Sequence, residues 1–416
     1  MGQTSVSFRE KERNLDESIS LSEVIAALSF AIELTDGAVH GHALRTCLLG
    51  MRIAEEAGFT QDEKSSLYYA LLLKDIGNEE MVGLRCDRGA SIVSKLGMGS
   101  LAADAVRHLE EHWDGSGYPN HVRGKKIPRL ARLCAIAQHL DMFSIGRNTA
   151  IAIETLEEWS GSWFDPELVK VALSLDRRDA LWTHCRATDS HEATRTAVLD
   201  LDPHERQRLD DEQVDKICEA FAEIVDAKSS FTFQHSISVA GLARGIATNL
   251  HLPEDRIRLV WRAALLHDLG KLSIPNRILD KKAELTESEW KVVRRHPGFT
   301  RKILDQIGPF REIAIVAGEH HEKLDGSGYP KQLTARDLSM ESRIIAVADV
   351  YGALSEERPY RAGLSNDEIL PILGALTPHK LDGDCVRALI KYLEQQKIVE
   401  FGATTDQQAQ LSRFCA

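Results

Sequence analysis

Seven histidine and aspartate side chains occur at intervals along the second half of this 416-residue chain. They are His235, His267, Asp268, His296, His320, His321 and Asp349. Neutral imidazoles and carboxylates bind divalent metals such as iron and manganese. The set is too large for one ion but suits two, with a carboxylate such as Asp268 shared between them. Two ions held close together can activate a shared water molecule and clamp a phosphate group for in-line attack.

Each part of this set is weak evidence by itself. A His-Asp pair at a helix end is more often a polar cap than a metal site, and an isolated lysine such as Lys271 is more often simply solvated. Asp349 is more informative, because it lies in the apolar run RIIAVADVYGAL at 343–354. A carboxylate there is costly unless it is paired or metal-bound. The ordered combination of these residues therefore favours a metal centre.

The segments that must position these residues occur twice along the chain. Five matches follow one another in order: His42 with His235, YALLLKDIGN (69–78) with RAALLHDLGK (262–271), WDGSGYP (113–119) with LDGSGYP (324–330), RLCAIAQ (132–138) with RIIAVAD (343–349), and FDPELV (164–169) with LDGDCV (381–386). A series of matches whose offsets grow slowly indicates a duplicated domain with a few insertions in the second copy.

The duplication divides the chain. We expect a polar tail at 1–20, a first domain at 21–200, a charged linker at 201–215, a second domain at 216–400 and a C-terminal tail at 401–416. Both repeats carry apolar residues at three- and four-residue spacing, which is typical of amphipathic helices. The prediction is an all-α fold of two tandem helical domains that pack as a pseudo-dimer within one chain.

The amino-acid composition argues against several classes of function. The 51 basic and 63 acidic residues give a net charge of −12, which argues against a broad surface for duplex nucleic acid. The seven cysteines are scattered without a CxxC motif, which indicates thiols in a reducing cytoplasm. Apolar runs fall short of the ~20 residues of a membrane helix, and the N-terminus lacks a signal-peptide core. We therefore expect a cytoplasmic protein that does not bind a membrane.

The second repeat contains a recognisable series of five segments. They are HS (235–236), HDLGK (267–271), HPGFTRKIL (296–304), HHEKLDGSGYP (320–330) and AVADVYGALSEERPYR (346–361). This series resembles the HD-GYP family of bacterial cyclic-dinucleotide phosphodiesterases, within the HD-domain metal phosphohydrolases. The GYP loop distinguishes the family from other HD enzymes. The resemblance implies HD-type helical domains, of which the first is degenerate.

The resemblance also implies roles for the polar residues. The first of two divalent metals, iron or manganese or another divalent ion, would be held by His235, His267, Asp268 and Asp349. The second would be held by His296, His320 and His321, with Asp268 bridging both ions. Catalysis would depend on Asp268 and Lys271, and the substrate phosphates would contact Lys271, Arg358 and Arg361. The GYP loop would comprise Asp325, Gly326, Gly328, Tyr329 and Pro330, as a surface for specificity and protein partners.

The implied activity is hydrolysis of a cyclic dinucleotide to a linear one by a metal-activated water. Cyclic di-GMP is the first expectation for the substrate and 3′,3′-cyclic GMP-AMP the alternative, since no residue decides between guanine and adenine. Two other functions remain open. The protein could be a signalling adaptor that lacks turnover and works through its GYP loops, or an HD phosphohydrolase for another phosphate ester. The sequence leaves both a monomer and a homodimer open.

Two positions of the second repeat depart from the family pattern. Some members have a glutamate four residues before the first histidine, where this chain has Phe231, and this favours two metals over three. The family often has an aspartate three residues after the last aspartate ligand, where this chain has Gly352. Neither change removes a ligand of the two predicted metals, although the second leaves substrate positioning open.

The first repeat has lost most of the predicted ligands. His42 and Asp75 remain, whereas the other positions hold Lys74, Asn78, Leu109, Glu110 and Gln138, and Asp87 lies near the place of His296. A lysine cation within a metal site would repel metal ions. We therefore expect a metal-free, non-catalytic domain, for which packing and docking on the second repeat are favoured over nucleotide binding.

Overall fold

The computed structural model describes residues 19–33, 41–77, 82–144, 149–187, 190–202, 208–226, 228, 234–356 and 362–396. Helices make up nearly all of the regular structure in these ranges, and a two-stranded antiparallel ladder completes it. The prediction of an all-α fold is therefore confirmed. Among the helices described, none combines the length and the apolar character that a bilayer-spanning segment requires.

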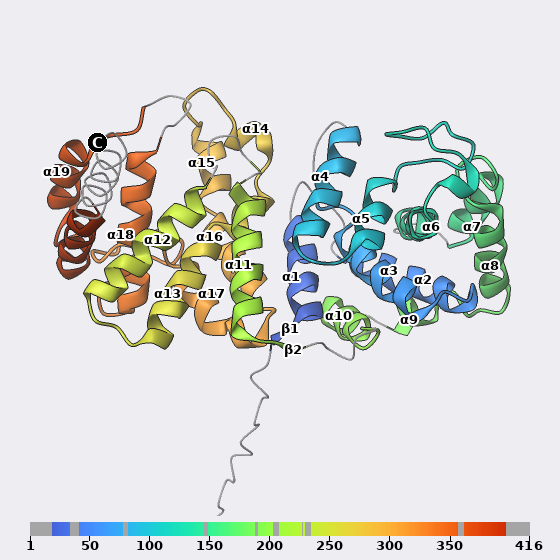
Figure 1. Ribbon diagram of the computed structural model, residues 1–416, viewed down its shortest axis with the longest axis horizontal. Coiled ribbons are helices and arrows are strands. Elements are labelled where there is room, and N and C mark those ends of the chain that lie inside the picture. The colour runs from blue at the N-terminus through green and yellow to red at the C-terminus, as the bar shows by residue number, and fades with distance from the viewer. Residues whose placement is uncertain are drawn as a thin grey trace, which may run out of the picture.

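Figure 1 shows two helical halves side by side. The first half contains α1 (Leu21–Glu33), α2 (His42–Glu56), α3 (Gln61–Leu73), α4 (Val82–Lys95), α5 (Ser100–Arg107), α6 (Arg129–Ser144), α7 (Thr149–Glu158), α8 (Pro166–Arg177), α9 (Thr183–Ala187) and α10 (His191–Leu199). The second contains α11 (Asp211–Asp226), α12 (His235–Asn249), α13 (Glu254–Leu266), η2 (Leu269–Ser273), α14 (Asn276–Leu279), α15 (Glu287–Val293), α16 (His296–Leu304), α17 (Arg311–Ala317), α18 (Met340–Ser355) and α19 (Asn366–Leu376).

The helix that begins with the first histidine is capped in the same way in both halves. Neither α2 nor α12 has a side-chain cap from its own N-cap residue. Instead, Glu33 at the end of α1 accepts a hydrogen bond from the Ala43 N–H at 2.6 Å, and Asp226 at the end of α11 accepts one from the Ser236 N–H at 3.0 Å. A negative charge at a helix N-terminus is favourable. The shared cap is physical evidence that both halves follow one plan.

The two halves meet along α1, which contacts α2 and α3 on its own side and η2 and α16 of the other half (Figure 1). Just before α1, β1 (Ile19–Ser20) pairs antiparallel with β2 (Arg208–Leu209). The Lys95–Glu223 ion pair joins α4 to α11, and Arg195 donates to the Gln306 carbonyl at 2.6 Å. The halves therefore form the pseudo-dimer that the duplication predicts, while the domain bounds stay a prediction.

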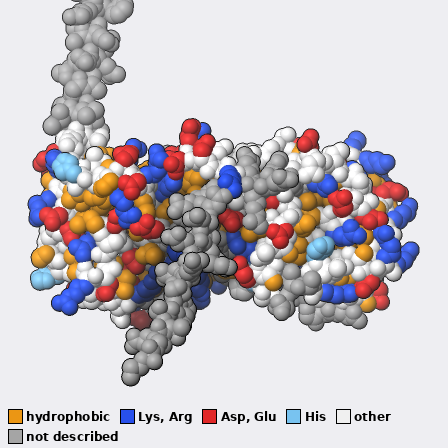
Figure 2. Space-filling model, turned by 90° about the horizontal axis from the view of Figure 1, so that it is seen from below, with side chains coloured by type: hydrophobic (Ala, Val, Ile, Leu, Met, Phe, Trp, Pro, Cys, Tyr) orange, Lys and Arg blue, Asp and Glu red, His pale blue; other side chains and the backbone are white. Residues whose placement is uncertain are grey.

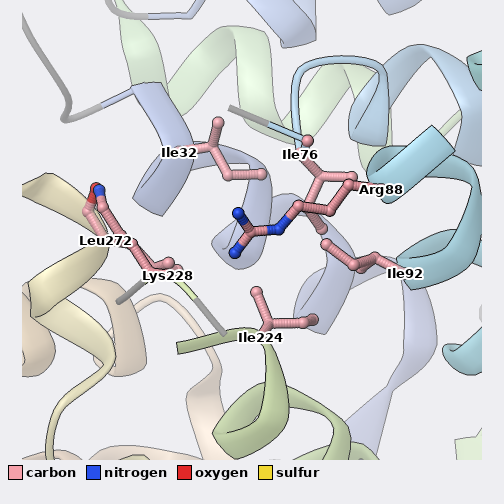
Figure 3. A pocket seen from close by; sticks show the side chains of 8 residues that line it. Ile32, Ile76, Arg88, Ile92, Ile224, Lys228 and Leu272 are labelled. Atoms are coloured by element: carbon pink, nitrogen blue, oxygen red, sulfur yellow. The ribbon is translucent and has the colours of Figure 1, made fainter. Parts of the chain in front are cut away.

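A small cavity of about 20 Å³ lies at this junction. Figure 3 shows Ile32 and Ile92 of the first half and Ile224 of the second around it, with the Arg88 guanidinium directed into the space between them. A volume of this size holds about one water molecule. The junction is therefore closely packed and leaves little room for a ligand.

Charged side chains of both signs are mixed on the molecular surface that Figure 2 presents. Lys and Arg side chains lie beside Asp and Glu side chains over both lobes of that face. A long phosphate backbone laid across it would therefore meet repulsion next to attraction. On this face, attraction of an anionic ligand requires a local site rather than a broad surface.

The turn that follows α13 packs tightly against the start of α16. A Cβ atom at Gly270, in η2, would lie 2.0 Å from the His296 carbonyl oxygen, so only glycine fits there. Thr300 fastens the same contact, because its hydroxyl accepts from the Gly270 N–H at 2.9 Å and donates to the His267 carbonyl at 2.8 Å. The turn and the helix are thereby held at one distance from each other.

At the outer end of the first half, His139 of α6 is buried in an aromatic cluster. Its ring centroid lies 4.4 Å from that of Phe143, 5.3 Å from Trp159 and 4.9 Å from Phe164. Its Nε2 atom is 2.9 Å from the Thr155 hydroxyl. Because burial disfavours the charged ring, the pKa of His139 is lowered to about 4. The imidazole is therefore neutral in the folded protein at neutral pH.

Replacing Gly270 tests the tight turn. We expect Gly270→Ala to lower the free energy of unfolding by about 2–3 kcal/mol, because the new methyl group forces η2 away from α16. Gly298→Ala is the matched control, since it lies in α16 with open space around a Cβ atom and should be neutral or slightly stabilising. Chemical denaturation of both variants checks this. Equal stability of the two variants would show that the contact is not tight.

The buried His139 predicts a pH-dependent stability. The folded-state pKa of about 4 lies below the ordinary value of 6.5, so between these pH values the unfolded chain binds more protons than the folded chain. Stability from this residue is complete above pH 6.5 and is lost as the pH falls, by about 3 kcal/mol at pH 4. Denaturation of the wild type and His139→Phe from pH 7 to 4 measures the difference, with the exposed His251→Asn as control. A constant difference between wild type and His139→Phe would refute the assignment.

Candidate metal centre

The seven predicted ligands of the second repeat come from different segments and converge on one point. His235 is the first residue of α12, His267 and Asp268 lie between α13 and η2, and His296 is the first residue of α16. His320 and His321 follow α17, and Asp349 lies within α18. His321 is partly exposed, whereas the other six side chains are buried.

Three of the histidines are oriented by the chain itself. The Nδ1 atoms of His267, His296 and His320 each lie 2.7 Å from a backbone carbonyl oxygen three residues earlier. A carbonyl can only accept a hydrogen bond, so Nδ1 carries the proton and donates it. The Nε2 atom of each ring is then directed to the centre as the ligand atom. Such a hydrogen bond on the far side of a ring is the usual support of a metal-binding histidine.

The carboxylate of Asp268 lies between two groups of imidazoles. Its Oδ2 atom is 3.3 Å from Nε2 of His267 and 3.8 Å from Nε2 of His235. Its Oδ1 atom is 3.3 Å from Nε2 of His296 and 3.9 Å from Nε2 of His320. Each oxygen therefore faces a different pair of histidines, which is the arrangement that a bridging carboxylate requires.

Asp349 also faces two sides. Its Oδ1 atom is 3.4 Å from Nε2 of His235 and 3.7 Å from Nε2 of His267, while its Oδ2 atom is 3.4 Å from Nδ1 of His321. The family resemblance places this residue with the first metal alone. The geometry adds a contact toward His321, which belongs to the predicted second set.

The donor atoms fit divalent cations. Within the described residues, His235, His267 and Asp268 form one group, and the three remaining histidines form another, with the ligand atoms of each group within 4.8 Å of one another. The Nε2 atom of His267 is buried and has no hydrogen-bond partner of good geometry. A polar atom buried in this way is costly unless something binds it. Nitrogen and oxygen donors in this mixture suit iron, manganese and similar metals.

Charges at the centre are set by close contacts. Burial would raise the pKa of Asp268, but the charges of His267 and Lys271 outweigh it and hold that pKa well below its usual range. Burial would raise the pKa of Asp349 as well, but the neighbouring imidazoles of His235 and His267 hold it well below its usual range. Both carboxylates are therefore ionised, as metal ligands must be.

The histidines differ among themselves. Burial lowers the pKa of His321 to about 3 and that of His320 well below its usual value, so both rings are neutral ligands at neutral pH. Burial would also lower the pKa of His267, but Asp268 and Asp349 raise it to about 10. A cation bound at His267 would therefore compete with a proton and replace it between the same two carboxylates.

Lys271 lies at the edge of the centre. Its ammonium group donates to Oδ2 of Asp268 at 2.5 Å, and 18% of its side chain remains exposed. The lysine can therefore be reached from outside, unlike the buried ligands. The other two predicted phosphate contacts, Arg358 and Arg361, lie outside the described residues, as does Phe231.

The GYP loop is held by hydrogen bonds within itself and to the residues just before it. Asp325 accepts from the Ser327 N–H at 2.9 Å, and Gly326 has a positive φ of 77° that suits glycine. A Cβ atom at Gly328 would lie 2.5 Å from the Glu322 backbone. Tyr329 reaches the centre, because its ring centroid lies 4.8 Å from that of His321. Pro330 is exposed beside it.

The sequence does not reveal two supporting residues. Thr300 fastens η2 to α16, as described above. Glu356 follows α18, and its carboxylate lies 2.8 Å and 2.9 Å from Nδ1 of His235. A spacing signal exists for Glu356, since it lies two helical turns after Asp349 and so shares its helix face.

Ion pairs occupy the corresponding centre of the first repeat. The fully buried ammonium of Lys74 pairs with Asp75, and Arg85 pairs with Glu110 at 2.6 Å. A Cβ atom at Gly77 would lie 2.0 Å from the Arg85 carbonyl, just as one at Gly270 would lie against that of His296. Arg85 therefore holds the place of His296. The approximate pairing with Asp87 is wrong by two residues, because an insertion shifts the alignment there.

The first repeat has a cleft beside these ion pairs. The cleft has a volume of about 350 Å³ and is bounded by Leu109, Glu110 and Gln138, the counterparts of three predicted metal ligands. Aromatic rings close its other side, where His112 and Trp163 stack with centroids 4.1 Å apart. The DGSGYP segment of this repeat is tied to its own half, because the Asp114 N–H donates to the Ser162 carbonyl at 2.8 Å.

Comparisons with known proteins agree with this geometry. A family model described as HD domain matches residues 28–168 and again residues 219–385. The 3′3′-cGAMP-specific phosphodiesterase 3 of Vibrio cholerae is 34% identical over 90% of this chain and 94% of its own length. The 3′3′-cGAMP-specific phosphodiesterase 1 of the same organism is 29% identical over 87% of this chain and 89% of its own length. A cyclic di-GMP phosphodiesterase response regulator of Xanthomonas campestris is 39% identical over 40% of this chain and 44% of its own length.

A solved structure is also similar over nearly the whole chain. The crystal structure of a cyclic GMP-AMP specific phosphodiesterase of V. cholerae matches with a TM-score of 0.66 and 32% sequence identity, over 91% of this chain and 98% of that one. The family model accounts for most of the chain, and each of its two matches contains one copy of the internal repeat. The chain therefore belongs to the HD domain family and carries the HD domain twice.

Proposed function

We propose that this protein is a metal-dependent phosphodiesterase that hydrolyses a bacterial cyclic dinucleotide to a linear one. The observation that carries the proposal is the position of Asp268, whose two oxygens face separate groups of histidines. Such a pair of sites supports phosphate ester hydrolysis, because two cations can share one activated water. The names of the relatives supply the substrate class.

The ligand assignment follows the two groups. In this proposal His235, His267, Asp268 and Asp349 would hold one metal, and His296, His320 and His321 would hold the other, with Asp268 facing both groups of histidines. Iron and manganese suit this set of nitrogen and oxygen donors best. The contact from Asp349 to His321 supports a second shared carboxylate.

Different residues of this protein then have different roles in the proposed reaction. Bound divalent ions supply an activated water and polarise the phosphate group. Asp268 and Asp349 hold fixed negative charge between the histidines and keep the Nε2 atoms directed inward. Lys271, at the edge of the centre, offers an ammonium group to the charge that develops on the phosphate oxygens. Arg358 and Arg361 remain predicted contacts for the second phosphate, since guanidinium groups bind phosphate oxygens in pairs.

The relatives favour one substrate over the other. The two relatives that match nearly the whole chain are named for 3′3′-cGAMP, whereas the relative named for cyclic di-GMP that is described above matches only about two fifths of it. We therefore propose 3′,3′-cyclic GMP-AMP as the preferred substrate, in place of the cyclic di-GMP that the family resemblance first suggests. The first repeat has no catalytic role in this proposal.

The setting of the protein is proposed on the same basis. We place it in the cytoplasm, because the cysteines described are thiols rather than disulfides. It acts there as a monomer or a homodimer, and its exposed GYP loops are the proposed surface for protein partners.

Asp268 provides the sharpest test of the metal centre. We expect Asp268→Asn to lower kcat by about 100-fold or more, since the shared negative charge is lost. Elemental analysis of the purified protein should give about two metals per chain for the wild type and fewer for the variant. Asp305→Asn, on the surface at the end of α16, is the matched control and should behave as the wild type. Full activity of Asp268→Asn would sink the proposed mechanism.

A panel of cyclic dinucleotides tests the substrate. Metal-loaded protein is offered 3′,3′-cyclic GMP-AMP, cyclic di-GMP and cyclic di-AMP, and the products are followed by chromatography. We expect the highest kcat/KM for 3′,3′-cyclic GMP-AMP, with a linear dinucleotide as the product. Turnover of none of the three by protein that holds its metals would favour the signalling adaptor instead.

A further inference from the structure

We infer that Glu356 is a positioning residue of the metal centre, which takes over a task that an aspartate performs in the first repeat. Its carboxylate orients the ring of His235 and makes its Nε2 atom a stronger ligand. The inference rests on the metal centre proposed above and concerns how one ligand is held. It gives a role to a residue to which the family resemblance assigns none.

His235 is held differently from the other buried histidines of the centre. The other three use a backbone carbonyl three residues earlier to fix their rings. His235, the first residue of α12, uses a side chain for this purpose. Its Nδ1 atom instead lies 2.8 Å from Oε2 of Glu356, while its Nε2 atom faces the carboxylate of Asp349 at 3.4 Å.

The first repeat shows the same arrangement with a different residue. His42 begins α2 as His235 begins α12, and its Nδ1 atom lies 2.6 Å from Oδ2 of Asp141 on α6. Asp141 stands three residues after Gln138, the counterpart of Asp349. Its own counterpart in the second repeat is therefore Gly352, which has no side chain to offer.

Gly352 occupies the position at which the first repeat has the carboxylate of Asp141. A Cβ atom at Gly352 would lie 3.9 Å from Nδ1 of His235, the atom that corresponds to the one Asp141 contacts in His42. It would also lie 2.9 Å from a methyl group of Val239, so the site has closed over the glycine. Glu356 lies one helical turn further along the same face, and its longer side chain reaches the ring from there.

A carboxylate behind a histidine ligand does more than a carbonyl can. Its negative charge raises the electron density of the ring and so strengthens the bond from Nε2 to a cation. In the first repeat the carboxylate of Asp141 is shared with Arg45 at 2.7 Å, and the pair with His42 is present although most of the other ligand positions hold different residues. The carboxylate therefore fixes the ring as part of the fold, independently of the metal ligands around it.

The experiment measures metal affinity in Glu356 variants by competition with a chelator. We expect Glu356→Ala to bind one of its two metals about 10- to 100-fold more weakly than the wild type, with an intermediate loss in Glu356→Gln. The kcat should fall while KM changes little, because the variant disturbs a ligand rather than the substrate. Glu284→Ala, on the surface, is the control, and unfolding of the metal-free proteins shows that each variant folds.

A transplant separates positioning from other effects of the substitution. In a Glu356→Ala background, Gly352→Asp restores a carboxylate at the place used by the first repeat, and Val239→Ala makes room for it. We expect this triple variant to regain most of the lost metal affinity. Wild-type metal affinity in Glu356→Ala would overturn the inference, and so would a folded triple variant that regains none. The chelator assay needs no dinucleotide, so it distinguishes failure of this inference from failure of the proposed substrate.

Discussion

The second half of the molecule is organised around one buried negative charge. Only 2% of Asp268 is exposed, and a carboxylate in such surroundings is stable only where donors and cations enclose it. Four imidazoles and the ammonium of Lys271 provide that enclosure, from segments that lie far apart in the sequence. The tight contact at Gly270 allows the turn that carries Asp268 to approach α16 closely. Packing of the helices and assembly of the metal centre are thus a single structural requirement.

The sequence predicts the helical fold, and the seven ligands that it predicts lie close together in the structure. Both predictions rest on local signals. Apolar spacing indicates the helices, and Asp349 is conspicuous within an apolar run. The supporting residues are different, because their roles depend on which helices touch. Thr300 and Glu356 look like ordinary surface-helix residues until α16 meets η2 and α18 meets α12. The correspondence between Arg85 and His296 could not be predicted from the sequence for the same reason. It is revealed by a backbone contact with a glycine rather than by the type of residue.

The first repeat holds ion pairs at positions where the second repeat holds predicted metal ligands. The positions of two ligands carry the cations of Lys74 and Arg85, and each is paired with a carboxylate at the same centre. In the first repeat, lysine and arginine side chains thus supply the positive charge that bound metal ions would supply in the second repeat. A buried carboxylate needs a partner of either kind, so the fold could survive the change. This half should consequently keep its structure in the presence of a chelator.

The position of α1 makes the second half depend on the first for part of its packing. This helix opens the first half, yet it lies against η2 and α16 of the second half, which carry Lys271 and His296. A fragment that begins at α11 would expose that side of the turn that carries Lys271 to water. The first half, which lacks most of the predicted ligands, therefore covers one side of the second half. Its sequence at α1 is constrained by this contact, whereas the positions of its missing ligands are not.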